Sequence, residues 1–186
     1  CHFHRVPGYL HASLENEEDE SRELREEVAL ARELGFDVEF VEAVPIVGLP
    51  GLSIRNQARF DPRAYLAGLA HMPILGKMSF ASATLFQSKL APYSSYAVSG
   101  LVPRGTAADV TLWDTSDPYY YLRVEDDGGG ERVILGGCDH KTGQLSETDE
   151  CFAKLERMLL RILPEVRLDR RWSGQVIESH DGLPLI

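Results

Sequence analysis

The chain has 186 residues, of which 44% are hydrophobic and 26% charged, as in one ordinary globular domain. Its formal net charge is −10 at pH 7, so it lacks the basic surface that DNA, RNA and acidic lipids require. No run of residues approaches the roughly 18 apolar positions of a membrane-spanning helix. We therefore expect neither a nucleic-acid partner nor a membrane partner.

The first segments alternate between strand and helix patterns. Residues 5–13 (RVPGYLHAS) are typical of a strand. The acidic run over 16–27 leads into an apolar stripe that continues to residue 34, which predicts a helix with a solvated acidic face. Gly35 is a natural end for this helix. Strands are then expected over 37–43 and 52–60.

The next segments begin with Asp61-Pro62, which predicts a helix through Leu69 because Asp caps helices and Pro suits their first turn. A further helix is expected over 78–90. Strands are expected over 94–102 and 109–113.

Residues 117–144 predict a β-hairpin. Residues 119–125 and 132–138 are rich in β-formers, and the glycine-rich segment between them predicts a turn. If Asp126 lies opposite Glu131, one face carries Leu122, Val124, Val133 and Leu135. The other face then carries Tyr119, Tyr121, Arg123, Ile134, Gly136 and Cys138. This second face is either a solvated surface or a wall that a planar group approaches closely.

The clearest helix is expected over 146–163, with Ser146 and Asp149 as a capping box and Pro164 as the stop. A last strand follows over 167–179. Seven or eight strands and three or four helices in mixed order predict an α+β fold. We expect a large mixed, mainly antiparallel β-sheet with helices packed on one side.

The three cysteines, Cys1, Cys138 and Cys151, form no CxxC pair, which favours a reduced, cytoplasmic setting. The fragment Cys1-His2-Phe3-His4 contains C-x-x-H, and Cys138-Asp139-His140 is C-x-H. A Rieske cluster requires these elements in the opposite order and close together. We therefore expect no metal site in this chain.

Four stretches together resemble one family: RVPGYLHA, NQARFDPRAYLAGLA, PYYYLRV…VILGGCDHKTGQ and RWSGQVIESHDGLPLI. In this order they are similar to the D-amino-acid-oxidase-like (DAO) FAD-dependent oxidoreductases. The strings GG-x-DHKTGQ and WSGQVIE-x-x-DGLP are most similar to the branch often fused to a C-terminal Rieske domain.

The resemblance implies a substrate domain without its FAD-binding domain, because no G-x-G-x-x-G follows a strand and opens a helix. Residues 1–186 would be a single substrate-binding domain in two segments, 1–70 and 71–186, joined near Ala70 and His71. FAD would be bound mainly by a domain outside this chain. Any [2Fe-2S] cluster would lie in a following Rieske domain.

The implied activity is oxidation of a small amine-type or related substrate by hydride transfer to flavin. The partners would be that substrate and the flavin domain of the same protein, and the fragment alone would be inactive. On the hairpin, Tyr119, Tyr121 and Arg123 are candidates for the cavity wall. Three further candidates are Arg55, Gln57 and His140, although a histidine at a strand end is more often structural.

The chain departs from the family at one position. The amino-acid oxidases of the family carry a carboxylate-binding arginine two residues after the glycine that matches Gly174, where this chain has Val176. Either another residue, such as Arg123, replaces it, or the substrate is not a free α-amino acid. The alternative function is a stand-alone α+β ligand-binding or dimerisation module without flavin. An isolated Rieske carrier is disfavoured by the order of its ligand motifs.

Overall fold

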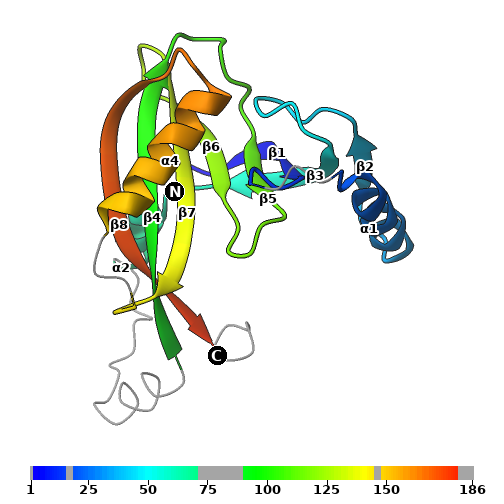
Figure 1. Cartoon of the computed structure of the whole chain (residues 1–186), viewed down its shortest axis with the longest axis horizontal. Helices are drawn as coiled ribbons and strands as arrows, with labels where there is room; N and C mark the ends of the chain where they lie inside the picture. Colours follow the sequence, from blue (N-terminus) through cyan, green and yellow to red (C-terminus); the bar gives the residue numbers. More distant parts are fainter. Residues whose placement is uncertain (1, 16–18, 71–89, 145–147, 180–186) are drawn as a thin grey trace.

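The computed structural model describes residues 2–15, 19–70, 90–144 and 148–179. It contains an eight-stranded sheet in the order β2-β3-β1-β5-β6-β7-β4-β8 (Figure 1). The strands are β1 (His4–His11), β2 (Val38–Val41), β3 (Gly51–Arg59), β4 (Leu90–Val102), β5 (Thr111–Asp114), β6 (Tyr121–Asp126), β7 (Glu131–Lys141) and β8 (Arg167–Ser179). The helices are α1 (Ser21–Glu33), α2 (Pro62–Ala70) and α4 (Asp149–Ile162).

The sheet is mixed and mainly antiparallel. Strands β1 and β5 pair in parallel, while the other six neighbouring pairs are antiparallel. The predicted α+β class is therefore confirmed. The expected bounds of β8, residues 167–179, match the observed strand.

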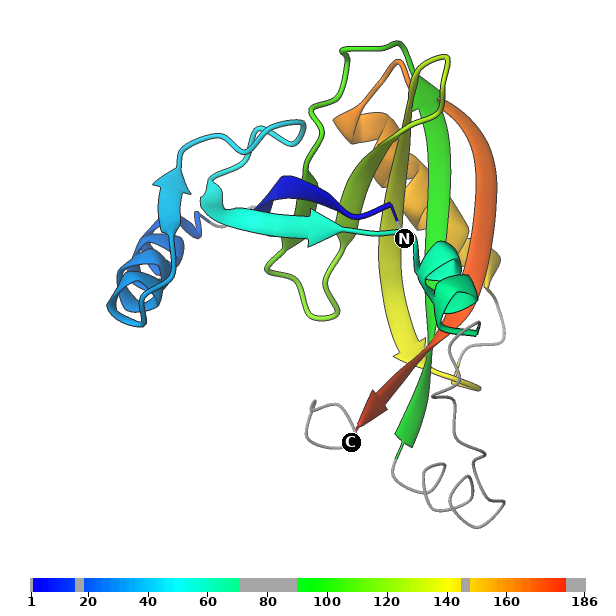
Figure 2. The ribbon, with the colours of Figure 1, turned by 180° about the vertical axis from the view of Figure 1, so that it is seen from behind.

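Helix α4 covers one face of β4 and β7, because packing there buries the apolar stripe of the helix away from water. Leu155 and Leu159 on this stripe are fully buried, against Val98, Val133 and Leu135 from the sheet. Helix α2 lies on the opposite face of these strands, as the two views in Figures 1 and 2 show. No residue of α2 is buried.

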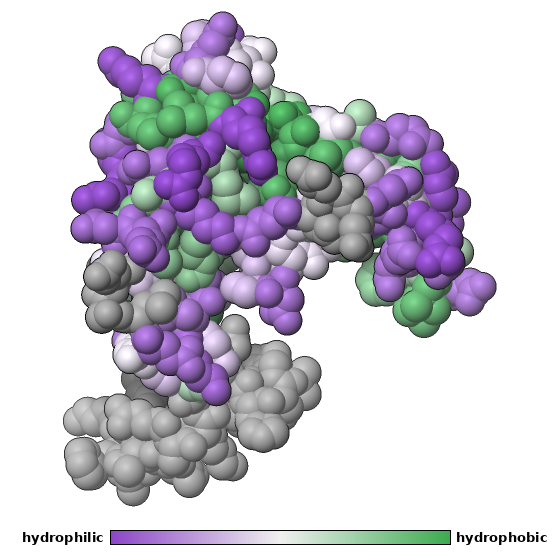
Figure 3. All heavy atoms as spheres, in the orientation of Figure 1, coloured by the Kyte–Doolittle hydropathy of each residue, from purple (hydrophilic) through white to green (hydrophobic). Residues whose placement is uncertain are grey.

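Strands β1, β2 and β3 and helix α1 extend away from the larger strands as an arm (Figure 1). The arm has its own small core, in which Leu24 and Val28 of α1 pack with Val38 and Leu52 of the strands. The charged residues of α1 face water as expected, and Figure 3 shows hydrophilic residues over most of this surface. The helix begins at Ser21, later than the acidic run predicted.

The predicted hairpin is confirmed as β6 and β7. Asp126 pairs with Glu131, Val124 with Val133, and Leu122 with Leu135. The four apolar side chains of this register all join the core under α4. Tyr119 precedes β6, since the strand begins at Tyr121.

The expected position of Cys138 is wrong. A β-bulge lies between the pairs Ser94–His140 and Tyr96–Gly137, where β7 has one residue more than β4. The extra residue breaks the alternation of side chains. Cys138 therefore packs against the core under α4 instead of facing away from it.

Some predicted features lie outside the described residues. These are residues 78–89 of the expected helix over 78–90, Ser146 of the capping box, and His71 at the expected segment join; Leu90 is the first residue of β4. Helix α4 begins at Asp149, after Thr148, whose side chain makes no capping hydrogen bond. Among the described helices, none is long and apolar enough to cross a membrane.

Candidate functional site

The sheet face opposite α4 carries the candidate site. Along β6 and β7, the side chains that alternate with the buried apolar set point to this face. The strand pairing extends the face onto the next two strands, with Ala97 opposite Trp172 and Ser99 opposite Arg170. Helix α2 lies above it (Figure 2).

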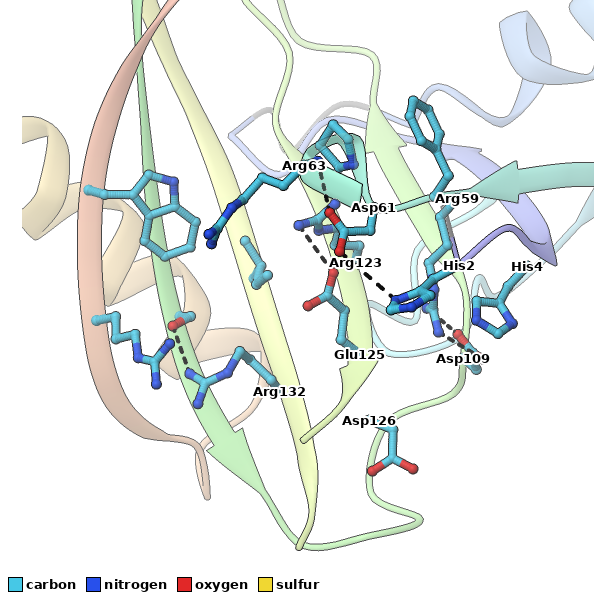
Figure 4. Close-up of a pocket in the computed structure, with 16 residues that line it drawn as sticks. His2, His4, Arg59, Asp61, Arg63, Asp109, Arg123, Glu125, Asp126 and Arg132 are labelled. Atoms are coloured by element: carbon cyan, nitrogen blue, oxygen red, sulfur yellow. Dashed lines mark hydrogen bonds and ion pairs between the residues drawn. The ribbon is translucent and has the colours of Figure 1, made fainter. Parts of the chain in front are cut away.

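A pocket of about 860 Å³ lies on this face, between the sheet and the start of α2 (Figure 4). Arg123 of β6 and Ile134 of β7 line it from the hairpin, and Trp172 lines it from β8. Its other walls carry charged residues from β3, α2 and the loop before β5. The lining there includes Arg59, Asp61, Arg63 and Asp109.

Two arginines of the pocket are neutralised locally. The Arg123 guanidinium lies 3.1 Å from a carboxylate oxygen of Glu125. Arg59 binds both carboxylate oxygens of Asp109, and it also donates to the carbonyl of Val124. The charges of these two arginines in the pocket wall are therefore paired.

A third arginine, Arg132, is buried beneath the pocket and joins three strands. Its Nη1 lies 2.7 Å from both carboxylate oxygens of Asp169 on β8 and 3.1 Å from Ser99 Oγ on β4. Ser99 Oγ in turn donates to Asp169 Oδ1 at 2.9 Å. The bond from Arg132 holds the pKa of Asp169 below its ordinary value, because it favours the charged carboxylate.

The start of α2 borders the same pocket. Asp61 Oδ1 accepts hydrogen bonds from the backbone N–H groups of Arg63 and Ala64, at 2.8 and 3.1 Å. The predicted Asp cap is therefore confirmed, and these bonds lower the pKa of Asp61. Figure 4 shows the Arg63 side chain extending from α2 across the sheet face.

Two of the predicted site residues lie on this face. Arg123 lines the pocket. The ring of Tyr121 lies over Gly136 of β7, where a Cβ on the glycine would be 2.1 Å from Tyr121 Cζ. Tyr119 is half exposed, with its ring centroid 6.4 Å from that of Tyr121.

The other three predicted site residues do not line this pocket. Arg55 is exposed on the arm, beside Asp37 and Glu39. Gln57, also on β3, packs its side chain against Gly8 of β1. His140 lies on the α4 side of the sheet, where its Nε2 is 3.0 Å from the hydroxyl of Tyr96. The fold thus separates Arg55 and His140 from Tyr121 and Arg123, while Gln57 lies on their sheet face but outside the pocket lining.

Local sequence patterns did not mark Arg132, Asp169 or Arg63 as site residues. The predicted hairpin register could have placed Arg132 on the face of Arg123, because both side chains alternate with the apolar set. No sequence pattern marked Asp169. It is the extra residue of β8 at a bulge opposite Ser99 and Gly100, and this bulge is visible only in the pairing of β8 with β4.

Solved structures share this fold across nearly the whole chain. Glycine oxidase from Geobacillus kaustophilus matches with a TM-score of 0.73 and 13% identity, over 98% of this chain and 61% of that one. L-proline dehydrogenase from P. horikoshii matches with a TM-score of 0.66 and 15% identity, over 96% and 62%. Iminodiacetate oxidase from Chelativorans sp. BNC1 matches with a TM-score of 0.64 and 16% identity, over 96% and 62%.

This chain has the fold of part of these oxidases and dehydrogenases. At such low identities the likeness concerns the fold alone, and the chain spans about three fifths of their length. No protein-family model matches the sequence, and no curated protein matches it closely enough to count as a relative.

The described residues do not form a site for a whole flavin dinucleotide. A diphosphate binds well at a helix N-terminus with free N–H groups and no competing carboxylate. Helix α2 begins with the cap of Asp61, α4 begins with Asp149 and Glu150, and α1 follows Asp19, which binds the N–H of Ser21. The described part of the chain therefore provides a sheet face for a ligand, but no phosphate-binding site at a helix N-terminus. It also contains no group of three or more His, Cys, Asp or Glu side chains that could hold a metal ion.

Proposed function

We propose that this chain is the substrate-binding domain of an FAD-dependent oxidoreductase that oxidises a small amine-type or related substrate. The observation that carries the proposal is the match of 96–98% of the chain to part of glycine oxidase, L-proline dehydrogenase and iminodiacetate oxidase. All three are named for redox chemistry on compounds with a C–N bond. The order of the family-like sequence motifs supports the same conclusion.

In this proposal the sheet face opposite α4 closes over the flavin in the full-length protein. The face has a pocket of about 860 Å³, which is large enough for a small substrate. Arg123 lines this pocket, and Tyr121 lies on the same sheet face, over Gly136. The role of the domain is to position the substrate and to exclude water, while the flavin, held mainly by another domain, supplies the redox chemistry.

The proposal includes the division of the chain into segments 1–70 and 71–186, with the flavin domain connected near Ala70 and His71. A Rieske domain with a [2Fe-2S] cluster, following this part of the protein, belongs to the same proposal and rests on the resemblance of the motifs. Its signature would be visible absorbance that persists after the flavin is extracted, and an electron paramagnetic resonance signal that appears on reduction with dithionite.

The deciding experiment is the visible absorbance spectrum of the full-length protein, before and after anaerobic addition of small amines such as methylamine, sarcosine and benzylamine. We expect flavin bands that bleach with at least one of them. A colourless full-length protein would overturn the proposal and favour the stand-alone ligand-binding or dimerisation module.

A second experiment uses the 186-residue chain alone. Since its described residues lack a phosphate cradle, we expect it to bind FAD more weakly than micromolar, and to have no oxidase activity. Isothermal titration with FAD checks this. Micromolar binding by the isolated chain would show that the flavin site is here and not in another domain.

A further inference from the structure

Three basic side chains of α4 line another pocket, on the α4 side of the sheet. They are Lys154, Arg157 and Arg161, and their spacing of three and four residues places them along one face of the helix. The pocket has a volume of about 330 Å³, at the lower end for small-molecule sites. Figure 1 shows α4 on the near side of the sheet, so this pocket is separate from the candidate site behind it.

The segment that follows β1 forms the opposite wall of this pocket. Arg161 Nη2 donates a hydrogen bond of 2.6 Å to the carbonyl of Leu14, which holds the guanidinium beside this segment. The side chains of Leu14 and Met158 also belong to the lining, and Met158 is buried. The pocket therefore combines apolar side chains with cations.

Among the described residues, Glu15 is the one carboxylate in the lining, and it already has two partners. It forms an ion pair with Lys154 and accepts a hydrogen bond of 2.8 Å from the hydroxyl of Tyr120. The ammonium group of Lys154 also lies over the Tyr120 ring, 5.4 Å from its centroid. Lys154 and Glu15 therefore neutralise each other.

The charges of Arg157 and Arg161 are not neutralised in this way. Neither arginine forms an ion pair with a residue in the described ranges. The carboxylates of Asp19 and Glu20, before α1, hydrogen-bond elsewhere, to the start of α1 and to the loop after β5. Like charges four residues apart on a helix repel each other. In a chain with a net charge of −10, this pocket is thus a local excess of two positive charges.

Two arginines without carboxylate partners suit a phosphate group. A guanidinium binds phosphate oxygens through two parallel hydrogen bonds. A phosphate monoester carries nearly two negative charges above its second pKa of about 6, so it matches the excess charge of the pocket. A carboxylate would compensate only one of the two charges.

We propose that this pocket binds a phosphate dianion, with Arg157 and Arg161 holding its oxygens and with Leu14 and Met158 beside any organic group that it carries. The ligand is inorganic phosphate or a small phosphate monoester, which share this group. The inference goes beyond the proposed function, because the pocket lies across the sheet from the candidate site and involves no flavin. The role is binding alone, and no bond is made or broken.

The test is isothermal titration of the full-length protein at pH 8 with three probes. Inorganic phosphate and methyl phosphate are dianions at this pH, while dimethyl phosphate is a monoanion of similar size. The main variant is Arg157→Gln, because Arg157 makes no hydrogen bond or ion pair within the described ranges whose loss would disturb the fold. The control variant is Arg22→Gln, which removes the same charge from an exposed position on α1. Circular dichroism and the Tm of each variant report whether the fold is retained.

We expect the wild type and Arg22→Gln to bind at least one of the two dianions about tenfold more tightly than dimethyl phosphate. Arg157→Gln should lose about tenfold in affinity for that dianion, and the double variant Arg157→Gln/Arg161→Gln should show no measurable binding. Tighter binding of methyl phosphate than of inorganic phosphate would identify a monoester as the ligand, and the reverse would identify inorganic phosphate.

Equal binding of the dianion by the wild type and Arg157→Gln would overturn the inference. A wild type that binds neither dianion, or that binds dimethyl phosphate equally well, would overturn it too. None of these titrations depends on flavin reduction, so the absorbance spectrum of the same sample tests the proposed function separately.

Discussion

The Nη1 atom of Arg132 lies 2.7 Å from both carboxylate oxygens of Asp169, and this contact spans β4 to join β7 with β8. Ser99 of β4 hydrogen-bonds to both partners. The three strands beneath the candidate pocket are thus held together by one polar network as well as by their backbone ladders.

Removing one partner of this network should destabilise the protein. In Asp169→Ala, the 8% exposed Arg132 would keep the hydrogen bond to Ser99, and its remaining carboxylate partner would be Asp127, which is itself part exposed. We expect a loss of about 2 kcal/mol in the free energy of unfolding, which is less than the usual 3–5 kcal/mol for a fully buried pair. Urea denaturation measures it. Asp37→Ala, which removes a partner of the exposed Arg55, should cost less than about 1 kcal/mol.

The same contact predicts a dependence of stability on pH. The hydrogen bond from Arg132 lowers the pKa of Asp169 from its ordinary value of 3.8 in the folded state. A carboxyl with a lowered folded pKa contributes stability that is present above its unfolded pKa and is lost as pH falls through the folded pKa. We therefore expect the stabilisation to be present at pH 5–7 and to decline below about pH 4.

Thermal unfolding between pH 2.5 and pH 7 measures this decline. In Asp169→Asn, which cannot titrate at this position, the acid-induced decrease in Tm should be smaller than in the wild type. Identical acid profiles for the two proteins would show that the Arg132–Asp169 contact does not contribute to acid sensitivity.

The contact between Gly136 and Tyr121 predicts a coupled pair of substitutions. A Cβ on Gly136 would overlap the Tyr121 ring, so Gly136→Ala should displace that ring and cost about 1–3 kcal/mol of stability. In a Tyr121→Ala background, Gly136→Ala should cost much less stability, because the Tyr121 ring that its Cβ would overlap is absent. A double-mutant cycle by urea denaturation measures the difference. Gly174→Ala serves as the control, since its Cβ would meet no atom within 4 Å.

Leucine-to-alanine substitutions on the two faces of α4 should lower the free energy of unfolding by very different amounts. Leu155 is fully buried against the sheet, and Leu160 is 41% exposed. Leu155→Ala should cost about 2–5 kcal/mol because it leaves a cavity in the core. Leu160→Ala should cost less than about 1 kcal/mol. Comparable losses in chemical denaturation would mean that α4 does not pack on β4 and β7 through this stripe.

Local sequence patterns determined much of the fold. The register of the β6–β7 hairpin followed from the alternation of Leu122 and Val124 with polar residues, since a shift of one residue would turn the apolar side chains of one strand to the other face. The Asp cap of α2, the apolar stripe of α4 and the bounds of β8 followed from signals within a few residues of one another. Such signals act over short distances, so they are readable without knowledge of the fold.

The tertiary structure alone decided how the candidate site is assembled. One extra residue at the bulge turned Cys138 toward α4 and Asp139 toward the opposite face. No local sequence pattern predicted this bulge. Strand order placed Arg55 on the arm, far along the sheet from Arg123. Arg132 and Asp169 are 37 residues apart in sequence, and they meet because β4 pairs with both of their strands. Non-local pairing sets these contacts, because a strand's neighbours depend on the whole sheet and not on its own residues.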